Sequence, residues 1–413
     1  MIPLEIQYFS FNRILLLVIG LWPYQQSKLT RLQFICFSTI LTAGVIFQLT
    51  TLMTSKCTSN LVRVLSSASL FIVSLIKYNS FCINIEAVKD LLMQFQHICS
   101  QLKDKNEVAI IEEYSCSARR YTIILTIFAV STAFVIITSQ YWLNTLVVLP
   151  KNVSQLRHLP IMMEYFIDQE KYFYLILLHF SAVICVGWAS ILAIGTMLIT
   201  LMQCICGMFR IACVVLAEKL SFSVLLYNYD TNIYSYRIKH AININIRQNI
   251  TLKNKILMTE GIICAVDIHR QAMKLSKHLL STFEIMMFCL IVCGVACLTL
   301  NLFQIFQIAS SENNVEEFFF PLLCVSVSII YMFIANYIGQ DIIDHNNDVL
   351  FTAYNVQWYR APLHIQRMIL FLLQRVTKEF TLNVGGLFSA SIECFATLVK
   401  SSVSYFTVIY STR

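Results

Sequence analysis

Charged and hydroxyl side chains recur every three or four residues in the last apolar segment of the chain, SASIECFATLVKSSVSYFTVIYSTR at residues 389–413. That spacing places them on one face of a helix, opposite an apolar face. Polar groups in a membrane helix nearly always face the interior of a helix bundle or a water-filled cavity. The pattern therefore favours an ion path lined by several copies of this helix. The members of this polar stripe are Ser389, Glu393, Thr397, Lys400 or Ser401, Ser404, Val408 and Ser411.

Val408 is the most apolar member of the polar stripe, and a ring of such side chains can close an ion path by excluding water. A second interpretation stays open. The serines and threonines could hydrogen-bond to neighbouring helices of one bundle, with Lys400 satisfied internally. A stripe along the whole helix is more than such contacts need, so we favour the ion path with Val408 as its gate.

Asp341, Asp344, His345 and Asp348 form the strongest acidic cluster, and their spacing puts them on one helix face. A divalent metal could use them, but hard cations are usually held by loop oxygens or by several helices. We interpret the cluster as a solvated helix and expect no metal site. Glycine-rich phosphate loops, a nucleophile elbow and a zinc-type His-Glu-x-x-His are all absent from the sequence. We therefore expect neither an enzyme nor a cofactor.

The composition is that of a membrane protein. Of the 413 residues, 57% are hydrophobic and 13% are charged, and the mean hydropathy is +0.68. Soluble domains are nearer half apolar and a quarter charged. About 20 apolar residues are needed to cross a bilayer as a helix. We expect an all-α protein with seven membrane-spanning helices, at residues 32–55, 64–83, 121–143, 172–203, 285–308, 318–338 and 387–410.

Lysine and arginine gather in the N-terminal tail and in the loops after the second, fourth and sixth spans. Such loops usually lie in the cytoplasm. The N-terminus is then cytoplasmic and the C-terminus extracellular. A G-protein-coupled receptor has the opposite orientation, and its Asp-Arg-Tyr and Asn-Pro-x-x-Tyr signatures are missing. We assign the net charge of +7 to this loop asymmetry and expect no nucleic-acid partner.

Two glycosylation sequons test this orientation. Asn152-Val153-Ser154 falls in a loop predicted to be outside, whereas Asn249-Ile250-Thr251 falls in a predicted cytoplasmic loop. We therefore expect a glycan on Asn152 and none on Asn249.

The chain divides into six predicted regions. An apolar run that Pro23 stops predicts a short helix lying against the membrane. The regions are a cytoplasmic N-terminal segment with this helix (1–31), spans one to four (32–203), a cytoplasmic loop or anchor region (204–280), spans five and six (281–338), a cytoplasmic anchor segment (339–386) and a pore-lining seventh span (387–413).

The C-terminal third resembles the insect odorant receptors. The residues that carry the resemblance are Tyr337 and Gly339, then YNVQWY at 354–359, Pro362, and KSSVSYFTV at 400–408. GLWP at 20–23 is similar to the N-terminal motif of that family, and His269 also fits. The predicted cytoplasmic N-terminus is the orientation of the family as well.

The resemblance implies a ligand-gated, nonselective cation channel in the plasma membrane of a sensory neuron dendrite. In this family a ligand-specific subunit and a shared coreceptor form a tetramer surrounded by membrane lipid. The last helix lines the pore. The coreceptor has a large extra stretch before the fifth span that this chain is too short to contain. The chain therefore looks like a ligand-specific subunit.

Two features of the C-terminal end separate the alternatives. The sister gustatory receptors end in Thr-Tyr followed by Gln-Phe, whereas here Ser404-Tyr405 leads to Tyr410-Ser411-Thr412, so that alternative is weaker. Thr412 stands where the coreceptor pattern has an apolar residue, which favours Val408 over Thr412 as the gate.

The family places an odorant pocket in the outer halves of spans two, three, four and six. A mostly apolar pocket with a few polar groups is the usual ligand site. His179 could donate a hydrogen bond to an oxygenated odorant. We expect Lys77, nearer the inner side of span two, to extend to the cytoplasmic interface. The pocket residues predicted on this basis are Phe71, Ser74, Phe134, Ile137, Tyr141, Tyr174, Leu178, His179, Phe320 and Cys324.

Overall fold

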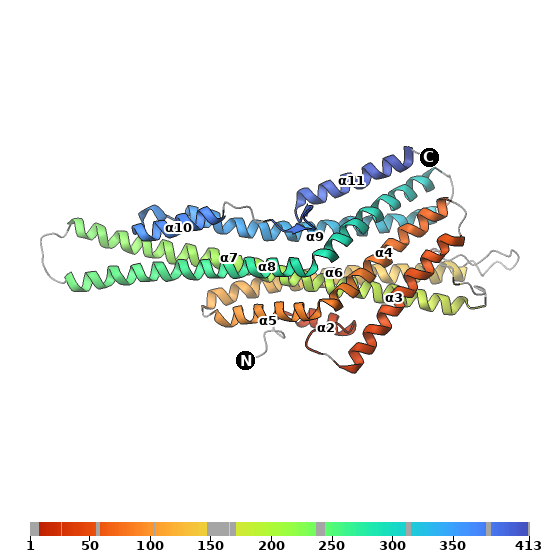
Figure 1. The fold of residues 1–413 in the computed structure, drawn as a ribbon, viewed down its shortest axis with the longest axis horizontal. Coiled ribbons are helices and arrows are strands. Elements are labelled where there is room, and N and C mark those ends of the chain that lie inside the picture. Colours follow the sequence, from red (N-terminus) through yellow and green to blue (C-terminus); the bar gives the residue numbers. More distant parts are fainter. Residues whose placement is uncertain are drawn as a thin grey trace.

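Long helices running side by side make up almost all of the protein (Figure 1). The structure is a computed structural model, and it describes residues 8–25, 27–54, 58–102, 104–146, 165, 171–236, 244–310, 315–376 and 381–411. Its helices are α2 (Ser10–Val18), α3 (Lys28–Thr54), α4 (Thr58–Ile83), α5 (Ile85–Gln101), α6 (Lys105–Leu146), α7 (Phe173–Tyr236), α8 (Ile244–Ala309), α9 (Val315–Asn355), the 3₁₀ turn η1 (Trp358–Arg360), α10 (Leu363–Val376) and α11 (Ile392–Ser411).

Seven of the described helices are long and apolar enough to cross a membrane, namely α3, α4, α6, α7, α8, α9 and α11. They match the seven predicted spans in order, so the predicted all-α, seven-span fold class is confirmed. Each span was identified by its apolar composition, and several helices continue well past the apolar part. The helix of the sixth span, for example, runs on from residue 338 to Asn355.

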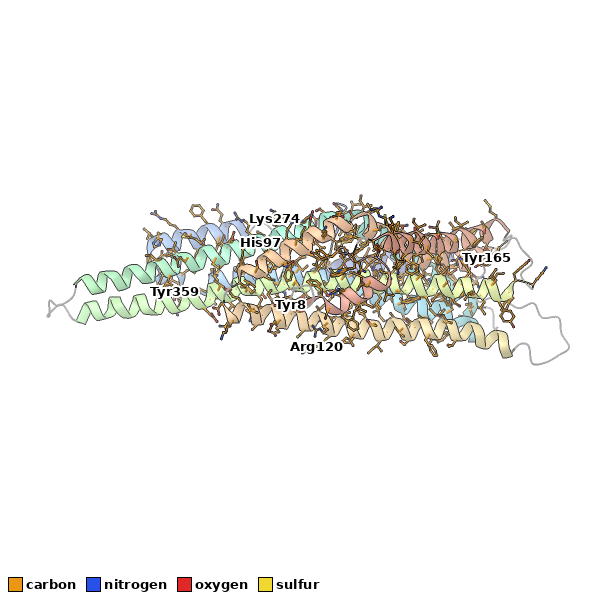
Figure 2. The ribbon with its side chains drawn as sticks, turned by 90° about the horizontal axis from the view of Figure 1, so that it is seen from below. Tyr8, His97, Arg120, Tyr165, Lys274 and Tyr359 are labelled. Atoms are coloured by element: carbon orange, nitrogen blue, oxygen red, sulfur yellow. The ribbon has the colours of Figure 1, made fainter. Side chains whose placement is uncertain are left out.

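Helices α7 and α8 have 64 and 66 residues. At about 1.5 Å per residue each is roughly 100 Å long, some three times the hydrocarbon thickness of a bilayer. They continue side by side beyond most of the bundle, toward the left of Figure 1, where α10 lies beside them. Tyr359 lies toward this end of the molecule and Tyr165 lies at the opposite end, while Arg120 and Lys274 lie between them (Figure 2).

The Gly-Leu-Trp-Pro motif ends helix α2 and turns the chain toward α3. Gly20 has a left-handed backbone (φ +73°), and the N–H groups of Gly20 and Leu21 donate to the carbonyls of Leu17 and Leu16. This pair of bonds is the Schellman arrangement that closes helix C-termini. Leu21 and Trp22 are then buried in the main core. Helix α2 itself packs on α6 and α7, where the buried Asn12 donates to Thr200.

A two-stranded antiparallel hairpin, β1 (Asn383–Val384) and β2 (Phe388–Ser389), precedes the last helix. Gly385 and Gly386 have φ values of +62° and +68°, a region that glycine enters without steric penalty. The Gly385 N–H donates to a carboxylate oxygen of Glu284 on α8 at 3.1 Å. The seventh helix was predicted from residue 387, but it begins at Ile392 because this turn occupies the chain before it.

Helix α7 occupies the centre of the bundle and contacts α3, α4, α6, α8 and α9. Its buried residues join those of α2, α4, α5 and α8 in the largest apolar core. Aromatic stacking adds to this core, since the rings of Phe81 and Phe283 lie 5.9 Å apart and 17° from parallel. A separate cluster built on Leu298, Met332 and Leu398 attaches α11 to α8 and α9.

Candidate functional site

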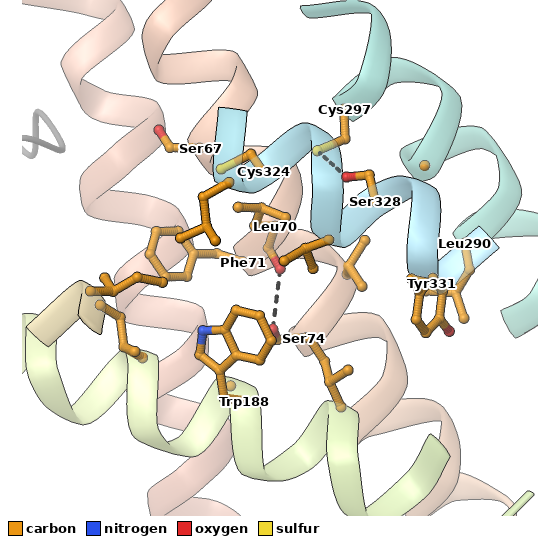
Figure 3. Close-up of a pocket in the computed structure, with 18 of the residues that line it drawn as sticks. Ser67, Leu70, Phe71, Ser74, Trp188, Leu290, Cys297, Cys324, Ser328 and Tyr331 are labelled. Carbon is orange, nitrogen blue, oxygen red and sulfur yellow. Dashed lines mark hydrogen bonds between the residues drawn. The ribbon is translucent and has the colours of Figure 1, made fainter. Parts of the chain in front are cut away.

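Helices α4, α7, α8 and α9 line an apolar cavity of about 100 Å³, to which α6 contributes Ile136. We refer to this space as the outer cavity. Most of its walls are aliphatic and aromatic side chains, as in most small-molecule sites. Figure 3 shows Phe71 and Trp188 facing one another across it. Its lining includes Ser67, Leu70, Phe71, Ser74, Val183, Ile184, Gly187, Trp188, Leu290, Cys297, Phe320, Cys324, Ser328, Tyr331 and Met332.

The two α4 serines of the outer cavity, Ser67 and Ser74, present lone pairs more readily than protons. Ser74 donates to the Leu70 carbonyl at 3.1 Å, and Ser67 donates to the Arg63 and Val64 carbonyls of its own helix. Each oxygen keeps acceptor capacity after this bond. A ligand can therefore donate a hydrogen bond to these serines, and the indole N–H of Trp188 and the hydroxyl of Tyr331 add donor groups to the lining.

Four of the ten predicted pocket residues line the outer cavity: Phe71 and Ser74 on α4, and Phe320 and Cys324 on α9. Phe71 and Ser74 are one helical turn apart, as are Phe320 and Cys324, so each pair lies on one face of its helix. The prediction for these four residues agrees with their position, while contact with a ligand stays a prediction.

Three other predicted residues lie on the outside of the bundle. Phe134 is 66% exposed, Tyr174 is 76% exposed and Leu178 is 63% exposed, and none of them lines the outer cavity. Helix α6 instead presents Ile136 to the cavity, and Ile137 packs against the main core. Apolar segments that face lipid carry the same residue types as segments that face a pocket, so composition did not separate them.

His179 lies in the first turns of α7 and does not line the outer cavity. Its Nδ1 lies 2.8 Å from the Tyr165 hydroxyl, and its ring packs edge-on against Phe47. Burial raises the pKa of Tyr165 to about 12, so the phenol keeps its proton, and the tautomer of His179 sets which of the two groups donates. The remaining predicted pocket residue, Tyr141, belongs to α6, and its side chain lies outside the part of the chain that the structure describes.

Sequence reasoning missed two aromatic residues of the outer cavity, Trp188 on α7 and Tyr331 on α9. A tryptophan or tyrosine within an apolar span is a signal in itself, because its polar group needs a partner or a wet surface. Gly187 precedes Trp188, and a side chain there would come within 3.0 Å of the Ser74 hydroxyl. The glycine thus lets α4 and α7 approach closely at this cavity.

A second space, of about 230 Å³, lies next to the first, and we call it the inner cavity. The two share part of their walls, including Trp188, Leu290, Tyr331 and Met332. At its far end the inner cavity is lined by Val384 and Phe388 of the hairpin and by residues of α11 such as Cys394 and Leu398. A continuous set of side chains therefore connects the outer cavity with the last helix.

From Glu393 onward the predicted polar stripe lies on the exposed face of α11, whereas Ser389 belongs to β2 and Ser401 is only partly exposed. Glu393, Thr397, Lys400, Ser404 and Ser411 are all exposed, and Val408 is 59% exposed. The hydroxyls of Thr397 and Ser411 donate to carbonyls within α11. The stripe therefore points away from the rest of its own chain, which is the direction a shared ion path requires.

The opposite face of α11 holds the helix on the bundle. Leu398, Ser402 and Phe406 are buried. The Thr299 hydroxyl of α8 donates to the Ser402 carbonyl at 3.2 Å, and the rings of Phe306 and Phe406 lie 4.7 Å apart. The apolar residues Val403 and Ile409 are partly exposed at the borders of this face.

The family model described as "7tm Odorant receptor" matches residues 58–403, most of the chain. The protein belongs to this family. It is therefore a multi-pass membrane protein of a receptor family and not an enzyme. The match includes the predicted pocket residues, the hairpin and the first part of α11 up to Val403.

Curated relatives match this odorant receptor over shorter stretches. The "Odorant receptor coreceptor" of Anopheles gambiae is 21% identical over 160 residues, which is 39% of this chain and 33% of the relative. "Odorant receptor 33b" of Drosophila melanogaster is 23% identical over 157 residues, 38% of this chain and 41% of the relative. These alignments span about a third to two fifths of the relatives' length.

Solved structures of the olfactory receptor OR5 from Machilis hrabei share the fold of this odorant receptor. The structure in complex with eugenol has a TM-score of 0.71 at 12% identity, and another structure of OR5 has a TM-score of 0.70 at 14% identity. Both comparisons cover 98% of each chain. The likeness shows that the arrangement of helices is that of an insect olfactory receptor.

Two members of the acidic cluster, Asp341 and His345, are bonded to neighbouring helices of this odorant receptor. Asp341 accepts a hydrogen bond from Gln203 Nε2 at 2.9 Å and lies 3.2 Å from His345 Nδ1. The other ring nitrogen of His345 lies 2.6 Å from the Tyr114 hydroxyl, which ties α6 to α9. The prediction of a fully solvated face was wrong for Asp341 and His345, because α6 and α7 cover them.

Cys206 joins Asp341 and His345 in this network, and the three ligand-type atoms lie within 4.8 Å of one another. Both ring nitrogens of His345 and one Asp341 oxygen already contact protein groups. The arrangement is explained as a hydrogen-bonded brace between helices.

Two predicted functional positions lie outside the described residues: the glycosylation site Asn152 and the disfavoured gate Thr412.

Proposed function

We propose that this odorant receptor is the ligand-specific subunit of a heteromeric, odorant-gated, nonselective cation channel in the plasma membrane of a sensory neuron. It would bind a small, mostly apolar volatile and assemble with the shared coreceptor in a tetramer. The observation that carries this proposal is the polar stripe on the exposed face of α11. Several subunits that bring such faces together would enclose a hydrated path.

The outer cavity is the proposed odorant site. Its position between α4, α7, α8 and α9 and its apolar walls with a few hydroxyls support this role. The solved structure of OR5 from Machilis hrabei was determined in complex with eugenol, so a protein of this fold takes a small aromatic ligand.

Gating follows from the size of the outer cavity. A cavity of about 150 Å³ holds benzene, so a space of about 100 Å³ holds a larger odorant only after its walls move apart. A ligand that binds the expanded arrangement more tightly shifts the population toward it. Trp188 and Tyr331 belong to the walls of both cavities, and they would pass this expansion on toward the hairpin and α11.

The test is electrical. We would express the chain in cells alone and with the coreceptor, block G-protein signalling, and apply a broad panel of volatiles. Fast cation currents that require both chains and survive the block are the expected result. Currents from the chain alone would replace the heteromer with a self-sufficient channel. Responses abolished by the block would contradict the channel and revive a metabotropic receptor.

A further inference from the structure

Lys77 is the most unusual side chain in the membrane-spanning part of the receptor. We predicted that it would reach the cytoplasmic interface, but it is 1% exposed and its side chain lines the inner cavity. Its ammonium lies over the ring of Tyr331, 4.6 Å from the ring centroid. That prediction was wrong because α7 and α8 pack against α4, and Tyr331 of α9 covers the ammonium.

The ammonium of Lys77 has no carboxylate beside it. Among the residues that the structure describes, no aspartate or glutamate lines the inner cavity, and Lys77 makes no hydrogen bond or ion pair. Two other polar side chains of the lining, Thr196 and Asn336, direct their donors to carbonyls of their own helices. A buried cation is strongly disfavoured unless an anion or a set of acceptors compensates it. The face of one tyrosine compensates a lysine only in part.

We propose that the inner cavity is a binding site for a small organic carboxylate, whose head group pairs with Lys77 and whose apolar body fills the space toward the hairpin. The walls beyond Lys77 are almost entirely aliphatic, aromatic and methionine side chains, including Phe128, Met202, Met287 and Ile338. One cation at one end of an apolar space matches an amphiphile with one negative charge. A phosphate would need several more donors than this cavity offers.

The volume sets the size of the ligand. An apolar cavity of about 150 Å³ binds benzene, with six non-hydrogen atoms, so about 230 Å³ holds roughly nine or ten. Octanoate, with ten, is therefore a suitable probe. A fatty acid of membrane length is too large for the cavity and is not the proposed ligand.

Gly195 marks the place where the head group would lie. A Cβ built on Gly195 would be 3.5 Å from the Lys77 nitrogen, which is ordinary contact. Gly195→Leu would therefore project a side chain into the space beside the ammonium. Because the far walls of the same cavity include the hairpin and α11, occupancy would bias the last helix. This effect on gating rests on the proposed channel function, whereas binding of the carboxylate does not.

The experiment measures thermal unfolding of the purified full-length receptor with octanoate, with its neutral methyl ester and with oleate. A ligand that binds only the folded state raises the melting temperature according to its concentration and affinity. We expect octanoate to raise it for the native sequence, with binding at least tenfold weaker in Lys77→Met and in Gly195→Leu. The methyl ester should affect the native chain and Lys77→Met equally, which also shows that the variant is folded.

The outcomes separate the proposal from its alternatives. Equal stabilisation of the native chain and Lys77→Met by octanoate would overturn the proposal, as would no stabilisation of either. In both cases Lys77 would be compensated by cavity water alone. If oleate raised the melting temperature and octanoate did not, the inner cavity would be assigned to a membrane lipid, and the proposal would also be overturned. Retained octanoate binding in Lys77→Arg is expected, since the charge is kept. Because no current is recorded, this result is independent of whether the receptor forms a channel.

Discussion

At the residue scale, two phenylalanines of similar sequence context have opposite environments. Phe71 on α4 is buried, lines the outer cavity and meets Phe180 edge-on at 6.5 Å between ring centroids. Phe134 on α6 points out of the bundle. Both were predicted as pocket residues, and only the direction of each helix face distinguishes them. The pair therefore provides a matched test of the outer cavity.

We predict that Phe71→Leu weakens odorant sensitivity at least tenfold, because the ligand loses contact with the ring that forms one wall. A tenfold change corresponds to about 1.4 kcal/mol of binding free energy. Phe134→Leu, the control, should leave the half-maximal concentration unchanged. Concentration–response curves of odorant-evoked current measure both. Equal responses of the two variants would remove the outer cavity from odorant recognition.

Val408 is the residue that we propose closes the ion path. Its side chain is 59% exposed on α11, so replacement with alanine removes little packing within the subunit. A less apolar constriction wets more readily, so we predict that Val408→Ala raises the basal current several-fold. Ile409→Ala, about 100° further round the same helix, is the control. A Val408→Ala channel with unchanged basal and evoked currents would show that Val408 is no gate.

At the element scale, the crossing of α9 with the segment before α11 explains why glycine stands at 339. A Cβ on Gly339 would lie 2.4 Å from the Ala390 Cβ and 2.6 Å from its carbonyl oxygen. Nearby, the backbone N–H of Ile392 donates to Gln340 Oε1 at 3.4 Å. The chain just before α11 therefore contacts the backbone of α9 directly, and this contact leaves no room for a side chain at position 339.

We predict that Gly339→Ala destabilises the receptor by about 1–3 kcal/mol, since backbone atoms of the segment before α11 must move to make room. Gly294→Ala is the matched control, because there the nearest atom is the Met332 sulfur at 3.4 Å, at the flexible end of a side chain. Melting temperatures of the purified variants measure the difference. If both variants melt together with the native chain, the close approach at Gly339 is not a structural constraint.

The sequence predicted which elements exist better than where they end or which way they face. Long apolar runs identified all seven spans, because a bilayer requires them. The last span was predicted to begin at residue 387, five residues before α11 begins at Ile392. The apolar residues that follow the turn at Gly385 and Gly386 look like the start of a span in the sequence. The polar stripe from Glu393 to Ser411 lies on one face of α11 because its period is visible in one helix, whereas its first predicted member, Ser389, lies before that helix in β2. The pocket side of α6 was missed by one residue, Ile137 for Ile136, since no polar residue marks that face.

At the scale of the whole molecule, an odd number of spans places the two ends of the chain on opposite sides of a membrane. Figure 2 shows Arg120 and Lys274 away from the end that carries Tyr165, as the loop charges require if the Tyr165 end is extracellular. The extensions of α7 and α8 lie at the other end and would then enter the cytoplasm (Figure 1). The same orientation brings the exposed face of α11 across the membrane with Val408 near its outer side.

The glycosylation sequons test this orientation directly. Asn249, in the cytoplasmic part of α8 under this proposal, should carry no glycan, whereas Asn152 should carry one. We predict that glycosidase treatment of the receptor from cells raises its gel mobility, that Asn152→Gln abolishes this shift, and that Asn249→Gln leaves it intact. The sequons are alike in pattern, so each variant controls for the other. A shift lost only in Asn249→Gln would invert the topology, place the basic loops outside, and leave Val408 at the wrong end of the proposed ion path.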